Sequence, residues 1–141
     1  MSVRNKELEK GFKTLKPFID QCEILSLNRE EADALGGMAA IGHLPQAAFL
    51  LTEGAKGATV RVGRKTFRAA ALKAKRVNTT GAGDAFGSAF VATWIKTGDG
   101  RDSLAAAMLN ATGVVSHMGA KAGILKKMPS AKELKRVSIR P

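Results

Sequence analysis

The spacing of hydrophobic and polar residues changes along the first part of the chain. Apolar residues recur every three or four positions over 7–18, which predicts an amphipathic helix. Pro17 is expected to end this helix early, because proline has no amide hydrogen to donate within a helix. The short apolar runs at 22–27 and 47–52 are typical of the buried strands of a parallel sheet.

The segment between these two predicted strands is polar and begins with a helix signal. Asn28 precedes residues 29–35, and Glu31 follows it by three positions, which is the pattern of a capped first turn. The glycine pair at 36–37 is expected to end this helix. One or two further helical turns are expected over 38–44.

The second half of the chain begins with strict alternation. Apolar and polar residues alternate at 58–62 and 65–69, with a glycine and an arginine between them, which predicts a β-hairpin. The remaining expected elements are a strand at 72–77, a loop of small residues at 78–83, helices at 84–96 and 102–118, and a basic helix at about 130–138. This order predicts an α/β fold, and the absence of a linker predicts a single domain over 1–141.

Two side-chain patterns in the predicted long helices have structural explanations. Phe86, Phe90 and Trp94 lie on one stripe of the first helix and are expected to face the core. Asn110 in the second helix is expected to be solvated or to pack between helices.

Composition narrows the class of protein. The 141 residues are 45% hydrophobic and 25% charged, which is typical of a globular domain. Cys22 is the sole cysteine, so an internal disulfide is excluded. No run of 18 apolar residues occurs, and the first ten residues lack the apolar core of a signal peptide. We therefore expect a soluble cytoplasmic protein that does not span a membrane.

The net charge of +11 is concentrated in the second half. Residues 71–141 carry 12 basic and 4 acidic side chains, against 11 and 8 in residues 1–70. Such a half favours an anionic partner, namely nucleotide phosphates, nucleic acid or an acidic protein, although a solvated basic surface would have the same composition. The chain has no tyrosine and no aromatic residue among the lysines of 121–136, so a nucleic-acid partner is not expected.

The segment at 77–86 has the chemistry of an anion site. A predicted strand leads into the small residues Gly81, Ala82 and Gly83, which then lead into a predicted helix. The first amide groups of a helix have no acceptor within it, and small residues let a phosphate approach them closely. Asp84 would lie at the mouth of this site, where a carboxylate can accept a proton from a hydroxyl group. A tight turn followed by an ordinary acidic first turn is the structural alternative.

Three motifs in a fixed order resemble one enzyme family. The string Asn-Thr-Thr-Gly-Ala-Gly-Asp-Ala-Phe at 78–86 closely resembles the C-terminal signature of the ribokinase-like, or PfkB, carbohydrate kinases. Asn28 with Glu31 resembles the family's Asn-x-x-Glu motif, and residues 52–57 resemble its Thr-x-Gly-x-x-Gly turn. Gly119 with the following alanine resembles the Gly-Ala pair that closes the nucleotide pocket, so the resemblance runs over about 8–120.

The resemblance implies a fold and a role for each matched residue. The fold would be the C-terminal half of a ribokinase-like, Rossmann-like three-layer sandwich. Asp84 would be the general base, beside an anion hole made of Gly81, Ala82 and Gly83. The implied ATP-binding residues are Asn28, Thr52, Gly54, Gly57 and Gly119. Glu31 would help to hold Mg²⁺ through water, and Asn78 with the carbonyl of Thr80 would lie near a monovalent cation such as K⁺.

The chain also departs from the family pattern. Family members are about twice as long, and nothing here resembles their N-terminal half, which supplies most of the sugar site. Asn78 replaces the aspartate that is most common at that position. Glu31 has a second explanation as part of a capping box with Asn28, and residues 52–57 as a plain turn between strands.

These observations leave three functions to compare. The first is the ATP-binding segment of a sugar kinase, whose partners are ATP and a small sugar-like substrate. The second is a non-catalytic nucleotide-binding or regulatory module. The third, supported by charge alone, is a basic nucleic-acid-binding protein. The missing half would be supplied by a chain that carries it or by self-association into a homo-oligomer, or it would be lost from a truncated gene product.

Overall fold

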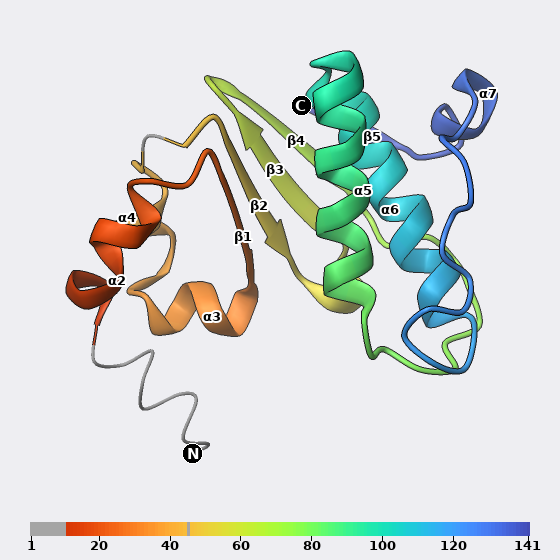
Figure 1. The fold of residues 1–141 in the computed structure, drawn as a ribbon, viewed down its shortest axis with the longest axis horizontal. Coiled ribbons are helices and arrows are strands. Elements are labelled where there is room, and N and C mark those ends of the chain that lie inside the picture. The colour runs from red at the N-terminus through yellow and green to blue at the C-terminus, as the bar shows by residue number, and fades with distance from the viewer. Residues whose placement is uncertain (1–10, 45) are drawn as a thin grey trace.

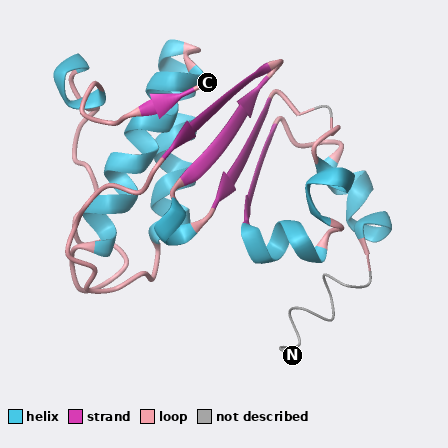
Figure 2. Cartoon of the chain, turned by 180° about the vertical axis from the view of Figure 1, so that it is seen from behind, coloured by secondary structure: helices cyan, strands magenta, loops and turns pink. Residues whose placement is uncertain are grey.

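The structure is a computed structural model that describes residues 11–44 and 46–141. It contains one five-stranded sheet with helices on both faces, so the expected three-layer α/β arrangement is confirmed (Figures 1 and 2). In chain order, the elements are α2 (Phe12–Ile19), β1 (Ile24–Asn28), α3 (Arg29–Ala34), α4 (Gly37–Ile41), β2 (Ala48–Thr52), the 3₁₀ turn η1 (Gly54–Lys56), β3 (Ala58–Val62), β4 (Lys65–Ala69), α5 (Ala82–Thr97), α6 (Gly100–Val115), α7 (Ala131–Leu134) and β5 (Ile139–Arg140).

The strands lie in the sheet in the same order as in the chain. β1 and β2 are parallel, and β2 to β5 follow one another in antiparallel pairs. The predicted strands at 22–27 and 47–52 and the predicted hairpin are therefore confirmed. β1 forms one edge of the sheet and β5 the other (Figure 2).

Each face of the sheet packs its own hydrophobic core. On one face, α5 and α6 cover the sheet, and Phe86 and Phe90 are buried there with Leu104. Trp94 packs against this core and stacks on Phe90 with ring centroids 6.1 Å apart, so the predicted aromatic stripe is core. On the other face, residues of α2, α3 and α4 pack against β1 and β2. Among the described residues, no helix is long and apolar enough to cross a membrane.

The first helix continues past its proline, so the prediction that Pro17 ends it was wrong. α2 begins at Phe12 and includes Pro17 as its sixth residue before ending at Ile19. Proline removes one backbone hydrogen bond, but the Asp20 amide still donates to the Lys16 carbonyl at 2.8 Å. Ile19 is buried in the core beneath α2, and this packing holds the last turn in place. The start of the predicted helix, at 7–10, lies outside the described residues.

The prediction of a strand at 72–77 is also wrong, because β5 occupies the position beside β4 at the edge of the sheet. β5, which was not predicted, pairs with β4 through Ala69 and Ile139. The segment 72–77 therefore runs outside the sheet, and the Val77 amide instead donates to the Val115 carbonyl at 2.8 Å. The chain before the loop of small residues at 78–83, called the phosphate loop below, is thus fixed to the end of α6.

The last three helices have boundaries that differ from the predicted ones. α5 and α6 each begin two residues before the predicted starts, and α6 ends at Val115. The basic helix expected at 130–138 is a single turn, α7, capped by Ser130. Val137 and Ile139 are buried against the sheet, so their burial draws the chain out of the helix and into β5.

Candidate functional site

Two of the motifs meet at the carboxyl ends of the parallel strands. Asn28 ends β1 and Thr52 ends β2, and the two residues are directly paired in the register of the sheet. Ligands of open α/β sheets bind outside the carboxyl ends of their strands. The parallel pairing therefore brings together motifs that lie 24 residues apart in the sequence.

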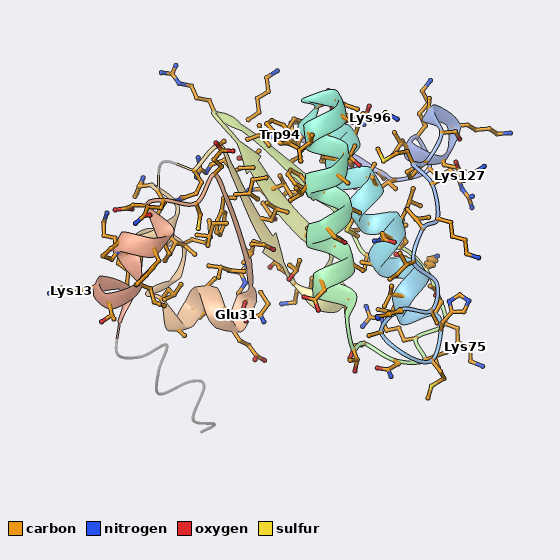
Figure 3. All side chains as sticks on the ribbon, viewed as in Figure 1. Lys13, Glu31, Lys75, Trp94, Lys96 and Lys127 are labelled. Carbon is orange, nitrogen blue, oxygen red and sulfur yellow. The ribbon has the colours of Figure 1, made fainter. Side chains whose placement is uncertain are left out.

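The first motif forms a complete capping box. The Glu31 amide donates to the Asn28 side-chain oxygen at 2.8 Å, and the Asn28 amide donates to the Glu31 carboxylate at 3.0 Å. Glu31 lies at the junction of β1 and α3 (Figure 3). The structural alternative given for this pair is therefore present, and it leaves both side chains at the carboxyl end of β1.

A charged contact joins the first motif to the second. The Arg29 guanidinium, at the start of α3, donates a hydrogen bond to the Glu53 carboxylate, which follows β2. This hydrogen bond, together with the charge of Glu53, raises the pKa of Arg29 above its ordinary value. Because both groups are near solvent, the pair orients the two turns more than it stabilises the fold.

The second motif is a tight turn that leads into β3. The Glu53 amide donates to the Gly57 carbonyl at 2.9 Å, across the single turn of η1. Gly57 has a φ of 105°, and a Cβ atom there would lie 2.0 Å from the Ala69 carbonyl oxygen. Glycine is required at this position, because the turn lies directly against the end of β4.

The phosphate loop is held from both sides. At its start, the Asn78 side-chain oxygen accepts a hydrogen bond from the Thr80 amide at 2.8 Å. At its end, Gly81 has a φ of 82°, and a Cβ atom there would lie 2.8 Å from the Cβ of Ala120. The loop therefore sits against the segment that follows α6, and its conformation depends on both glycine and that segment.

The first turn of α5 presents free amide donors. The Ala82 amide donates to the Thr79 carbonyl at 3.2 Å, and the Ala85 amide to the Gly81 carbonyl at 2.9 Å. Within the described chain, the amides of Gly83 and Asp84 have no such acceptor. Gly83 and the Asp84 carboxylate are exposed. A phosphate group would satisfy both amides and meet the positive end of the helix dipole.

One cavity of about 320 Å³ brings residues of all three motifs together. The predicted site residues that line it are Asn28, Thr52, Gly54, Gly57, Ala82 and Gly83. Those that do not are Glu31, Asn78, Thr80, Gly81, Asp84 and Gly119, although all but Gly119 lie within three residues of a lining residue. The roles of these residues remain predictions, and the structure adds their placement.

The cavity also has walls that the sequence analysis did not identify. They are Ala58, Ala71, Leu72, Ala74, Arg76, Thr79, Phe86, Met108, Ala111, Thr112 and Val115. Most of them come from α6 and from the irregular segment before the phosphate loop. Of these residues, Arg76 could have been found from the sequence, because it is a cation just before the predicted anion site. The residues of α6 form a helical stripe that looks like ordinary core in the sequence.

A buried amide side chain positions the start of α5. Asn110 of α6 is 4% exposed, donates to the Ala85 carbonyl at 2.7 Å, and accepts from the Leu125 amide at 2.8 Å. It therefore packs between helices, and it links the residue after Asp84 to the chain beyond α6. This packing role was one of the two expected for Asn110.

Replacing Asn110 by leucine is expected to lower the free energy of unfolding by about 2 kcal/mol, because the Ala85 carbonyl would lose its buried amide donor and the Leu125 amide would lose its acceptor. Urea denaturation would measure this loss. Thr112→Ala, which removes a hydroxyl bonded to the carbonyl one turn before it, is the control and should cost well under half as much. Equal losses in the two variants would contradict a linking role for Asn110.

Few protein side chains are available as ligands for the predicted Mg²⁺. In the described part of the chain, no group of three or more histidine, cysteine or acidic side chains is placed to hold a metal ion. Mg²⁺ in phosphate-transferring sites is commonly held by one or two carboxylates together with the phosphates. Glu31 beside the cavity fits that kind of site, in which the nucleotide supplies the other ligands.

Comparison with known proteins adds a family and a fold. The model of the pfkB family carbohydrate kinases matches residues 1–127. A search of curated proteins found no match. The solved structures that resemble the chain include several kinases of this fold.

Three of these structures show how much of the kinase fold is present. Nucleoside kinase of Methanocaldococcus jannaschii, an archaeal member of the ribokinase family, is 20% identical with a TM-score of 0.74, over 92% of this chain and 46% of that one. Fructokinase of Vibrio cholerae, with fructose, ADP and calcium bound, is 22% identical with a TM-score of 0.71, over 93% and 44%. Ribokinase of Arabidopsis thaliana, in complex with ribose and ATP, is 26% identical with a TM-score of 0.68, over 84% and 41%. The chain therefore spans less than half of each relative.

Proposed function

Because the chain belongs to the pfkB family of carbohydrate kinases, we propose that it carries the ATP site and the general base of a kinase that phosphorylates a sugar-like hydroxyl group. It would form the C-terminal, nucleotide-binding half of such an enzyme. The observation that carries the proposal is the cavity that residues of all three motifs share. Unrelated turns would have no reason to converge on one cavity.

The cavity suits a nucleotide in its chemistry. Its lining includes Gly54, Gly57 and Gly83, whose lack of side chains leaves backbone groups open to phosphates. It also includes Leu72, Met108 and further apolar residues of α6, which suit an adenine ring. Gly119, in the segment that follows α6, would close the nucleotide pocket, as the family resemblance implies.

The proposed reaction transfers one proton to the enzyme and one phosphoryl group to the acceptor. The Asp84 carboxylate would take the proton from the acceptor hydroxyl, whose oxygen attacks the γ-phosphorus of ATP while the bond to ADP breaks. The amides of Gly83 and Asp84, with Gly81 and Ala82 around them, would stabilise the charge on the transferred group. Asp84 is exposed next to these donors, which is where an acceptor hydroxyl would meet the phosphate.

The proposed cations have separate places. Glu31 would hold Mg²⁺ through water, while Asn28 and Thr52, which line the cavity, would face the nucleotide. Mg²⁺ supplies positive charge that screens the phosphates when it is bound. Asn78 and the carbonyl of Thr80 would lie near a monovalent cation such as K⁺. The Asn78 side chain also holds the loop through the Thr80 amide.

Calorimetric titration with ATP and Mg²⁺ tests the nucleotide site. We expect Gly83→Asp to weaken ATP binding about a hundredfold, because it adds a negative charge where the phosphates would lie. A Cβ atom at Gly83 meets nothing within 4 Å, so the fold should tolerate a side chain there. Gly83→Asn is the matched control, because it adds the same bulk without the charge, and it should bind ATP more tightly than Gly83→Asp. A well-folded wild-type chain that fails to bind ATP would contradict the proposal.

A non-catalytic nucleotide-binding module is the second candidate. It is favoured by β1, which forms an edge of the sheet among the described residues and so offers a backbone edge to a strand of another chain. This candidate predicts ATP binding without phosphoryl transfer by the chain alone. Transfer that appears only when a chain carrying the sugar-binding half is added would indicate a complementing partner. Turnover by a homo-oligomer of this chain would contradict the module.

A further inference from the structure

A second cavity, of about 450 Å³, is lined by several basic side chains. It shares Ala58 with the first cavity and is otherwise lined by different residues. Its charged side chains are Lys56, Arg68, Arg140 and Glu53. Lys56 belongs to η1, whose Gly54 lines the first cavity, so this turn contributes to both cavities.

The two arginines share one row across the sheet. Arg68 of β4 is directly paired with Thr59 of β3 on one side and with Arg140 of β5 on the other. Continued toward β1, the same row reaches Leu51, which packs under α2 to α4. This face of the sheet therefore changes from apolar over β1 and β2 to basic over β3 to β5. Figure 1 shows α2 to α4 gathered beside β1.

This arrangement places like charges beside one another. Like charges directly opposite each other on adjacent strands repel. Among the described residues, the ion pairs are Lys16 with Asp20 and Arg29 with Glu53. The Glu53 charge is thus already matched by Arg29. Arg68, Arg140 and Lys56 line one cavity in which Glu53 is the sole acidic side chain among the described residues.

We propose that this cavity is a second anion site, which binds a compact anion carrying phosphate groups between Arg68, Arg140 and Lys56. Guanidinium groups bind phosphate through paired hydrogen bonds, and lysine adds a point charge. Thr59 also lines this cavity, and its hydroxyl can donate a further hydrogen bond. The site is separate from the proposed ATP site and does not depend on it.

The alternative is that the arginines protect an edge of the sheet. β5 is an edge strand of two residues, and charged side chains on such strands prevent pairing with other chains. Edge protection needs charge but no particular ligand. A site for phosphate groups needs both arginines together. The two explanations therefore differ in whether one anion binds saturably between Arg68 and Arg140.

Titration of the ¹⁵N-labelled chain with pyrophosphate, followed by NMR of the backbone amides, tests the proposal. We expect shifts at Thr59 and Ser138 that saturate with one dissociation constant. Amides of the first cavity, such as Gly83, report separately on that site. Sugar phosphate and AMP, as further titrants, distinguish a sugar ester from a nucleotide as the source of the phosphate group.

The double variant with Arg68→Gln and Arg140→Gln should raise the pyrophosphate dissociation constant measured at the Thr59 and Ser138 amides about a hundredfold, which is tenfold for each arginine. Arg64→Gln is the matched control, since Arg64 is exposed in the hairpin turn and does not line the cavity. An equal loss in this control would overturn the proposal, as would unchanged affinity in the double variant. The absence of saturable shifts at Thr59 and Ser138 in the wild-type chain would overturn it without any variant.

Discussion

Replacing Asp84 by alanine is expected to lower phosphoryl transfer about a thousandfold while leaving ATP affinity unchanged or slightly increased. A positioned general base contributes rate factors of this size. The carboxylate is exposed beside the free amides of α5, where it would meet the acceptor rather than the nucleotide. Removing its negative charge also removes repulsion toward the phosphates. Transfer would be followed by ADP release over a panel of sugars, and affinity by calorimetry.

The matched control for this change is Asp102→Ala. Asp84 and Asp102 are each the third residue of their helix, so both changes remove the same favourable interaction with a helix dipole. We expect Asp102→Ala to leave transfer and ATP binding near wild-type values. A tenfold loss of ATP affinity in Asp84→Ala would contradict the role of base, and this measurement needs no turnover by the chain alone.

Replacing Gly57 by alanine is expected to lower the free energy of unfolding by about 3 kcal/mol or more and to weaken ATP binding with it. Gly57 has a φ of 105°, outside the range that alanine adopts without strain. The added Cβ atom would also lie 2.0 Å from the Ala69 carbonyl oxygen, so the turn and β4 would have to separate. Urea denaturation with a parallel ATP titration would measure both effects.

Gly54→Ala in the same turn separates strain from collision. Gly54 also has a positive φ, of 56°, but a Cβ atom there meets nothing within 4 Å. The expected cost is therefore about 1 kcal/mol, from backbone strain alone. Equal costs for the two variants would show that the close approach of Gly57 to β4 does not constrain the turn.

The local pattern of hydrophobic and polar residues was sufficient to predict most of the strands and helices. Alternation and apolar runs correctly predicted β1, β2 and the hairpin, because strand burial on a sheet face leaves a period of two or a continuous apolar run. The Asn28 capping box and the aromatic stripe of α5 were also confirmed, since both depend on residues within one or two turns. The errors arose where distant segments compete, as when β5 takes the place beside β4.

For the candidate site too, the local features were predicted from the sequence and the long-range contacts were not. The three motifs and their order were visible in the sequence, because their glycines and polar residues serve local turns and helix starts. Their convergence was not visible, since it depends on the parallel pairing of Asn28 with Thr52 and on the seat of Gly81 against Ala120. The walls contributed by α6 were missed for the same reason.

The sequence by itself therefore determined the elements, the motifs and the family resemblance, all of which rest on residues close together in the chain. Only the tertiary structure decided which motif residues share a cavity. It also decided that Arg68 and Arg140, 72 positions apart, lie opposite each other on the sheet face whose β1 and β2 part is covered by α2 to α4. Strand register between distant segments is set by the packing of both faces at once, and no local pattern records it.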